Sequence, residues 1–236
     1  MKPNLAYLNS VLAFAAVVPV ATAAEISGKI KLNGTPPPEK TITMDAMCGK
    51  LQPKPVTTRH YVVGADKGLA NVFVYIKNAD LKAPPAGEAQ LLDQVGCMYE
   101  PYVMGVVTGQ KFKIRNSDPL LHNVHATPKP GSGNKEFNFG QPVKGQVNEK
   151  QFDAPEVLVR MKCDVHPWMF AYVGVVNHPY FAVTDKDGNF KISGVPAGKY
   201  TVEAFHLKAG AKTQEVTVGA DEKKALEFTL DVPAAP

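Results

Sequence analysis

Apolar and polar residues alternate along most of the chain, which is the pattern of half-buried β-strands. From Ile26 to Leu32 every second residue is apolar or glycine, and the run ends at a turn signal, Asn33-Gly34. Residues 111–115 alternate in the same way, whereas residues 71–76 and 170–176 are almost continuously apolar, as in strands buried on both faces. Clusters of Gly, Pro, Asn and Asp separate these runs, and the pattern predicts no long amphipathic helix. The expected fold class is therefore all-β, a sandwich or barrel.

One predicted strand leads directly into the most unusual segment of the chain. The alternation over residues 157–163 places Val157, Val159, Met161 and Cys163 on one face. The strand at residues 170–176 follows after a tight loop. We therefore expect residues 163–169 to connect two neighbouring strands.

The last sixty residues form a second series of short alternating runs. They follow His178-Pro179 and include residues 200–206, 213–218 and 225–230. Such a change in pattern after an His-Pro step indicates a domain boundary. We expect one β-domain at residues 24–177 and a smaller β-sandwich at residues 178–236.

The first twenty-three residues do not share this pattern. A short segment with one charge, Lys2, precedes an apolar run from Val11 to Val20 and the small residues Ala21 to Ala24. This order is typical of a secretory signal peptide, residues 1–23, cleaved after Ala23. The apolar run is too short to span a bilayer, and no later run reaches eighteen apolar residues. The sequence therefore predicts a periplasmic or secreted protein that is not membrane-embedded.

The composition of 44% hydrophobic and 20% charged residues is that of an ordinary globular protein. The net charge of +4 is small, and the lysines are scattered rather than gathered in a stripe. The chain thus lacks the electrostatic footprint of a nucleic-acid-binding protein.

An exported chain with three cysteines is expected to pair two of them and leave one free. Cys48 and Cys97 both lie in loop-like surroundings in the first hundred residues, whereas Cys163 lies far downstream. We expect a Cys48–Cys97 disulfide and a free Cys163. An alternative is a soft Cu(I) site formed by Met44, Met47 and Cys48, because thioethers and thiolates suit that ion.

Potential metal ligands concentrate between Cys163 and Met169. A thiolate, an imidazole and a thioether lie within seven residues at Cys163, His166 and Met169, and these are ligands that copper prefers. Three extended residues span about 10 Å, so Cys163 and His166 can share an ion only across a turn. Pro167 favours such a turn, because it biases His166 away from the helical region. A further imidazole from residues 122–125 would complete a His₂Cys set with a weak axial Met.

The C-x-x-H-P-x-M run at residues 163–169, preceded by H-N-V-H at residues 122–125, resembles the cupredoxins, the type 1 blue copper proteins of the plastocyanin–amicyanin group. The resemblance covers residues 103–176, and its short ligand spacings are nearest amicyanin. It implies a Greek-key β-sandwich with one type 1 copper ion bound by His122, Cys163, His166 and Met169. It also implies that Asn123 braces the thiolate. The sequence before Val103 fits less well, with insertions at residues 44–60 and 78–94.

Several of these residues have plainer interpretations. His125 could replace His122 as the upstream ligand, or both could be solvated loop histidines. Met169 could be a core residue, since Met often fills gaps, and Cys163 could be an inert buried thiol. The three other histidines of the mature chain have no partner at metal spacing and are expected to be structural or surface residues: His60, His178 and His206.

Near the C-terminus, D-x-D-G-x-F at residues 185–190 and G-V-P-A-G-x-Y at residues 194–200 resemble the carboxypeptidase regulatory-like, transthyretin-like modules. This resemblance covers about the last fifty-five residues. It implies a small, non-catalytic β-sandwich.

The cupredoxin resemblance and the predicted signal peptide together imply an exported one-electron carrier. Since the sequence shows no second metal centre and no Ser/His/Asp or paired-carboxylate arrangement, we expect it not to be an enzyme. A binuclear copper centre needs two bridging thiolates, and the neighbours of Cys163 are Lys162 and Asp164 rather than the histidines that reach a second copper centre in multicopper enzymes. The implied partner is a periplasmic redox enzyme or a c-type cytochrome, docking at Pro167 and Trp168 where His166 is expected to reach the surface. Two alternatives remain open: a binding or adhesion protein with a vestigial metal loop, and a copper carrier or chaperone.

Overall fold

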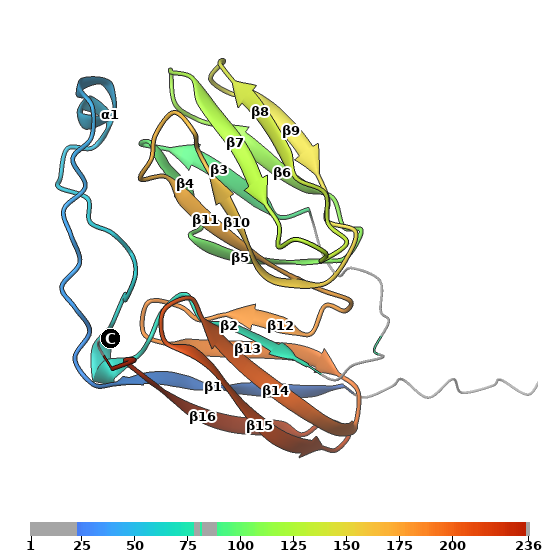
Figure 1. The fold of residues 1–236 in the computed structure, drawn as a ribbon. Coiled ribbons are helices and arrows are strands. Elements are labelled where there is room, and N and C mark those ends of the chain that lie inside the picture. The colour runs from blue at the N-terminus through green and yellow to red at the C-terminus, as the bar shows by residue number, and fades with distance from the viewer. Residues whose placement is uncertain (1–22, 78–80, 82–88, 235–236) are drawn as a thin grey trace, which may run out of the picture.

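The computed structural model describes residues 23–77, 81 and 89–234, and strands dominate this part of the chain (Figure 1). All but the last residue of the predicted signal peptide, and much of the predicted insertion at residues 78–94, lie outside the described residues. The strands form four sheets, which pack in pairs as a larger and a smaller sandwich. The all-β prediction, with the smaller sandwich towards the C-terminus, is confirmed. Among the described residues, no helix is long and apolar enough to cross a bilayer.

The larger sandwich pairs a five-stranded sheet, β5-β11-β10-β7-β8, with a four-stranded sheet, β4-β3-β6-β9. Its strands are β3 (Leu91–Val95), β4 (Met98–Glu100), β5 (Val103–Val107), β6 (Phe112–Asn116), β7 (His122–Thr127), β8 (Phe137–Gln141), β9 (Val147–Lys150), β10 (Glu156–Lys162) and β11 (Phe170–Val176). The predicted strands at residues 111–115 and 170–176 are thus confirmed. Their inward side chains, among them Phe112, Ile114 and Val173, form the core between the two sheets.

One feature of β10 departs from simple alternation. Val159, Met161 and Cys163 enter the core of the larger sandwich as predicted, but Val157 does not. Leu158 has a φ of 59°, and the pairing with β11 shifts register between Glu156 and Val159. Such a bulge turns the preceding side chain away, so Val157 packs instead against the hydrophobic cluster where the two sandwiches meet. The prediction that Val157 shares a face with Cys163 is wrong for this reason.

The smaller sandwich contains two strands from the beginning of the described chain. Its sheets are β13-β1-β16 and β12-β2-β14-β15. The strands are β1 (Ala24–Asn33), β2 (Phe73–Ile76), β12 (Phe181–Val183), β13 (Asn189–Val195), β14 (Gly198–His206), β15 (Gly210–Val218) and β16 (Lys223–Asp231). β1 lies between β13 and β16, parallel to β16, and β2 lies between β12 and β14. The predicted boundary, with residues 24–177 in one domain, is therefore wrong for β1 and β2, because strand pairing joins them to partners more than a hundred residues away.

The two sandwiches meet across an aromatic contact. Gly105 of β5 and Gly174 of β11 are paired in register, and the ring of Phe73 from β2 lies over both. A Cβ atom at Gly174 would lie 2.5 Å from Phe73 Cζ, and one at Gly105 would lie 2.3 Å from Phe181 Cε2. The absence of side chains at these two positions thus lets the smaller sandwich approach the sheet of the larger one closely.

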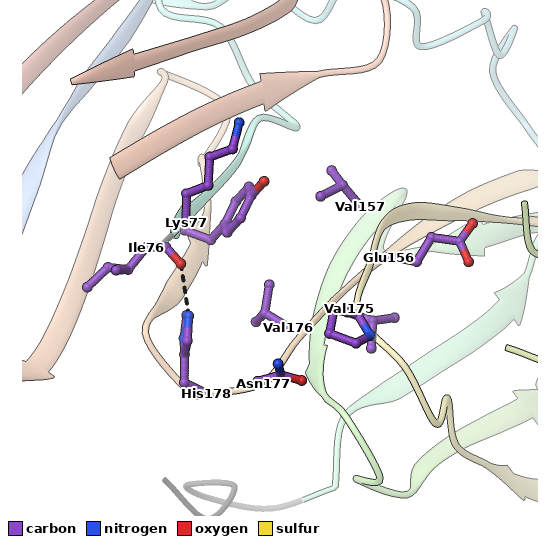
Figure 2. A pocket seen from close by; sticks show the side chains of 10 residues that line it. Ile76, Lys77, Glu156, Val157, Val175, Val176, Asn177 and His178 are labelled. Atoms are coloured by element: carbon purple, nitrogen blue, oxygen red, sulfur yellow. Dashed lines mark hydrogen bonds between the residues drawn. The ribbon is translucent and has the colours of Figure 1, made fainter. Parts of the chain in front are cut away.

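A pocket of about 220 Å³ lies beside this contact (Figure 2). Glu156, Val157 and Val175 line it from the larger sandwich, and Lys77 lines it just beyond β2. His178, in the connection from β11 to β12, donates a 2.9 Å hydrogen bond from Nε2 to the Ile76 carbonyl. This bond fixes the connection between the sandwiches, and it gives His178 the structural role expected for it.

Residues 34–62 leave the smaller sandwich after β1 and run beside the larger one before returning (Figure 1). They carry the one α-helix among the described residues, α1 (Ala46–Leu51), capped by the Asp45 carboxylate. The short 3₁₀ helix η1 (Ala65–Lys67) lies further along. The Cys48–Cys97 disulfide ties α1 to the β3–β4 turn, which confirms the predicted pairing. This segment, which contains the predicted insertion at residues 44–60, thus covers one end of the larger sandwich.

Candidate metal centre

The loop between β10 and β11 is a closed turn that brings Cys163 and His166 together. The Cys163 N–H donates to the Met169 carbonyl (3.2 Å), and the Met169 N–H donates to the His166 carbonyl (2.9 Å). Within this turn Cys163 Sγ lies 3.6 Å from His166 Nδ1. The turn predicted from Pro167 is therefore present.

His122 joins this pair from the neighbouring strand. It is the first residue of β7, which pairs with β10, and its Nδ1 lies 3.1 Å from His166 Nδ1. The Cys163 Sγ atom and a nitrogen of each imidazole all lie within 4.8 Å of one another. All three residues are buried. Three of the four predicted ligands thus converge.

This donor set fits a copper ion. Ligand atoms at about 2.0–2.3 Å from a metal lie within about 4 Å of each other, which is close to the spacing found here. Two imidazole nitrogens and one thiolate are the equatorial set of a type 1 copper site. Met169, the predicted axial ligand, has no exposed surface and packs in the same cluster as Cys163.

The surroundings of Cys163 favour its thiolate. Burial raises the pKa of this thiol, but hydrogen bonds from His122 and from the backbone N–H groups of Asn123, His166 and Val165 outweigh burial, so the pKa is lowered. The Asn123 N–H lies 3.4 Å from Sγ. Cys163 is therefore prepared to act as a metal ligand, which requires the deprotonated form.

The two imidazoles differ in their electrostatic surroundings. Burial on its own lowers the pKa of His122, but hydrogen bonds to Asp118 and Cys163 outweigh it, and the pKa is raised. Burial lowers the pKa of His166, and the charge of His122 lowers it further. In the absence of a metal, a proton in this cluster therefore resides on His122 before His166.

Asn123 braces the turn with its side chain as well as its backbone. Its Oδ1 accepts the Asp164 N–H (3.0 Å), and its Nδ2 donates to Asn138 Oδ1 (2.6 Å). The Tyr99 hydroxyl donates to the Asn123 carbonyl (2.7 Å). The residue that the cupredoxin resemblance singled out thus links β7, β8 and the ligand turn.

His125 lies away from this cluster. Its Nδ1 is 2.7 Å from Asp164 Oδ2, and its Nε2 is 2.6 Å from Glu136 Oε1. Both ring nitrogens are therefore occupied by carboxylates. The structure places His122, and not His125, beside Cys163 and His166.

The remaining histidines have no metal-like surroundings in the described residues. His60 is exposed, and His206 is buried with its Nδ1 accepting the backbone N–H groups of Lys208 and Ala209. The soft Cu(I) alternative is wrong, because Cys48 is bound in the disulfide and Met47 is 57% exposed.

The ring of His166, which was expected to reach the surface, is covered by other residues. The side chain of His166 is 6% exposed, and its Nε2 lies 3.6 Å from Asp45 Oδ2 in the segment that carries α1. Trp168 lies against the His166 ring, with centroids 5.3 Å apart, and donates from Nε1 to the Cys97 carbonyl (3.1 Å). Pro167 is exposed. The expectation that His166 reaches the surface is wrong, because the inserted segment and its disulfide close over it.

Two residues next to the imidazoles were missed from the sequence. Asp118 lies 2.8 Å from His122 Nε2, and Asp45 faces His166. The only signal for Asp118 was its position four residues before His122. Nothing in the pattern around Asp45, 77 residues before the nearest ligand, His122, pointed to the site.

The comparison with known protein families addresses the C-terminal part of the chain. The family model of the carboxypeptidase regulatory-like domain matches residues 165–231. This range begins within the ligand turn, includes β11 and ends with β16, and it leaves out β1 and β2 of the smaller sandwich. No curated protein matches the chain.

Among solved structures, similarity is partial. A copper-containing nitrite reductase from Thermus scotoductus SA-01 is 18% identical, with a TM-score of 0.34, over 42% of this chain and only 25% of the reductase chain. The oxidized state of a point mutant of amicyanin is 26% identical, with a TM-score of 0.31, over 37% of this chain and 81% of amicyanin. A purple cupredoxin from Nitrosopumilus maritimus is 22% identical, with a TM-score of 0.30, over 37% of this chain and 99% of that one. The chain is thus an all-β protein with a carboxypeptidase regulatory-like match at residues 165–231, and the solved structures that resemble part of it include amicyanin and a purple cupredoxin.

Proposed function

We propose that this protein is an exported type 1 copper protein that carries single electrons between redox partners. One observation carries the proposal: His122 Nδ1, Cys163 Sγ and His166 Nδ1 converge in a buried cluster although they come from two separate segments of the chain. Vestigial ligands would have no reason to keep this convergence. The geometry therefore favours a working metal site over the adhesion alternative.

His122, Cys163 and His166 would hold the copper ion, with Met169 as the weak axial ligand. The bound ion would supply one-electron chemistry by alternating between Cu(I) and Cu(II). The chain's own contribution is rigidity: the ligand turn is closed by two backbone hydrogen bonds, and Asn123 ties it to the neighbouring strands. Ligands that are held in place need little rearrangement when the ion changes its charge.

The burial of the ligands favours electron transfer over copper delivery. A chaperone must expose its ligands to a recipient, whereas His122 and Cys163 here are 0% and 2% exposed. Asp45 and Trp168 further cover His166. An electron can leave such a site through the covering residues, but an ion cannot leave without opening the cover.

We also propose a carrier rather than an enzyme. Asp164, next to Cys163, accepts from Lys162 (2.8 Å) and contacts His125, so the flanks of the thiolate are engaged in ion pairs at the surface. These flanking residues would not ligate a second copper ion, since neither is a histidine.

The partner in this proposal is a periplasmic redox enzyme or a c-type cytochrome, and the protein acts in the periplasm or outside the cell. Docking would involve the exposed side of the ligand turn, where Val165 is 49% exposed and Pro167 is exposed beside it. Trp168, whose ring lies against that of His166, would connect this surface to the copper ligand for electron transfer. A small apolar contact suits a partner that must be released quickly.

The test is a visible spectrum of the purified metal-free protein after addition of one equivalent of Cu(II). We expect an intense thiolate-to-copper band, which Cys163→Ser and His122→Ala both abolish while the far-ultraviolet circular dichroism stays that of a β-protein. His125→Ala is the matched control and should keep the band, because both ring nitrogens of His125 face carboxylates. A wild-type protein without the band, or a blue Cys163→Ser variant, would refute the proposed function.

A further inference from the structure

The imidazole of His122 is held on the side remote from the cluster. Its Nε2 lies 2.8 Å from Asp118 Oδ2, in a buried contact. The same carboxylate accepts two backbone N–H groups, from Gly96 (2.7 Å) and Cys97 (2.8 Å). Asp118 is 3% exposed, so its charge depends on these three donors.

His166 has a related but looser arrangement. Its Nε2 lies 3.6 Å from Asp45 Oδ2, beyond hydrogen-bond distance, and the Asp45 side chain is 50% exposed. The other oxygen of Asp45 accepts the backbone N–H groups of Met47 (2.8 Å) and Cys48 (2.9 Å).

The disulfide joins these two arrangements. Cys97 donates its backbone N–H to the carboxylate behind His122, and Cys48 donates its own to the carboxylate facing His166. The Cys48–Cys97 bond connects the two backbones covalently. The remote nitrogen of each imidazole thus faces a carboxylate that is anchored on one half of the same disulfide.

We propose that Asp118, mounted on the Cys97 arm of the disulfide, is a positioning residue that orients His122 towards the metal and biases the site towards the oxidised ion. Asp45 on the Cys48 arm makes the same contribution to His166 more weakly, because its contact is longer and open to water. This inference rests on the proposed copper site.

The chemical reason lies in the tautomer of His122. A carboxylate at Nε2 can only accept, so the ring proton of the neutral imidazole is held at Nε2 and the Nδ1 lone pair faces Cys163 and His166. A hydrogen bond from a ligand imidazole to a carboxylate also makes the ligand nitrogen more basic. A more basic nitrogen stabilises Cu(II) more than Cu(I), because the higher charge gains more from a stronger donor.

A purely structural role for Asp118 predicts a different result. In that case its carboxylate would only pin the Gly96–Cys97 turn, and removing it would weaken the fold without changing the preference of the site for either oxidation state. The experiment must therefore measure that preference as well as stability.

The test compares Asp118→Asn with Asp45→Asn in the copper-loaded protein. Loss of such a contact behind a ligand typically lowers metal affinity 10–100-fold. Because Cu(II) gains more than Cu(I) from the stronger donor, we expect this loss to fall mainly on Cu(II). The preference of the Asp118→Asn site for Cu(II) over Cu(I) should then fall at least about tenfold. For one electron this is a rise in reduction potential of about 59 mV. Asp45→Asn is the matched control, with the same change of charge beside the other imidazole, and should produce a smaller rise.

A second measurement needs neither copper nor a variant. Nitrogen-15 NMR of the histidine rings in the metal-free wild-type protein at a pH where His122 is neutral should show its proton on Nε2. A proton on Nδ1 would overturn the inference even if Asp118→Asn failed to fold.

The outcomes separate this inference from the proposed function. A wild-type protein that gives no thiolate-to-copper band refutes both. A blue wild-type protein whose Asp118→Asn variant is folded, equally blue and unchanged in potential refutes the role of Asp118 alone.

Discussion

The two sandwiches use buried polar groups in different ways. In the smaller one, the buried side chains of His206 and Thr184 bind the backbone: His206 accepts two backbone N–H groups, and Thr184 bridges Val72 and Leu69. At one end of the larger sandwich, Asp118, His122, Cys163 and His166 also contact one another, in addition to the backbone N–H groups that Asp118 and Cys163 accept. Polar groups that satisfy the backbone stabilise a fold, whereas polar groups whose lone pairs converge on one point indicate a site.

The largest effect that separates the two sandwiches should come from the disulfide, which belongs to the larger one. The Cys48→Ala/Cys97→Ala variant opens a loop closed across a sequence separation of 49, and the chain-entropy model puts the loss at about 4 kcal/mol of unfolding free energy. Urea unfolding, followed in each sandwich separately, should show this loss in the larger sandwich.

Thiol counting checks the premise of this prediction. Denatured, unreduced wild-type protein should expose one reactive thiol, that of Cys163. Three reactive thiols would contradict both the pairing and the stabilisation expected from it.

Acid should destabilise the smaller sandwich through His206. Burial lowers the pKa of His206 to about 4, whereas an unfolded histidine titrates near 6.5. Below pH 6.5 the unfolded chain takes up a proton that the folded one refuses, so stability is complete above that pH and falls as the pH drops towards 4. The loss amounts to about 3 kcal/mol.

The control for this pH dependence is His206→Asn, whose amide oxygen can still accept the N–H groups of Lys208 and Ala209 but does not titrate. Its unfolding free energy, measured by denaturant titration between pH 7 and pH 4, should depend on pH much less than that of the wild type. The same slope in variant and wild type would assign the acid sensitivity to another group.

The contact between the two sandwiches should be weakened by adding a side chain at Gly174, one of the two glycines under the Phe73 ring. Gly174→Ala places a methyl group 2.5 Å from Phe73 Cζ, and overpacking of this kind costs about 1–3 kcal/mol. Gly49→Ala, where a Cβ meets nothing within 4 Å, is the matched control and should not lower the unfolding free energy, because alanine favours a helix such as α1 over glycine.

A double-mutant cycle assigns this cost to the ring. Phe73→Leu should be less harmful in the Gly174→Ala background than in the wild-type background, because the smaller side chain makes room for the methyl group. If the free-energy changes of the two substitutions were additive, the cost of Gly174→Ala would not come from its contact with the Phe73 ring.

The smallest change in stability is expected at Met169. Met169→Leu conserves volume and should cost less than about 1.5 kcal/mol, while the blue colour persists and the reduction potential rises because a weak donor that favours Cu(II) is lost. Met161→Leu is the control, since Met161 is equally buried in the same cluster on β10. Equal potentials in the two variants would make Met169 a core residue.

Local patterns were enough to predict several of the strands, the ligand turn and the pairing of Cys48 with Cys97. Alternation of side chains is a property of the strand itself, and the turn from Cys163 to Met169 is set by seven adjacent residues and one proline. His122 followed from the cupredoxin resemblance, and the choice between it and His125 depends on position along one strand. Residues three apart on a strand face opposite sides, so only one of the two histidines could meet Cys163.

Tertiary structure alone decided which strands share a sheet and what lies behind the ligands. β1 and β2 pair with strands more than a hundred residues away, and the residues of a strand do not by themselves identify the strand with which it pairs. Asp118 reaches His122 locally, but its anchors at Gly96 and Cys97, and the closure of Asp45 over His166, exist only once distant segments have packed. The ligand residues can be recognised from the sequence because their types occur at short spacing. Their electrostatic surroundings come from contacts between segments far apart in the chain, and no local pattern predicts such contacts.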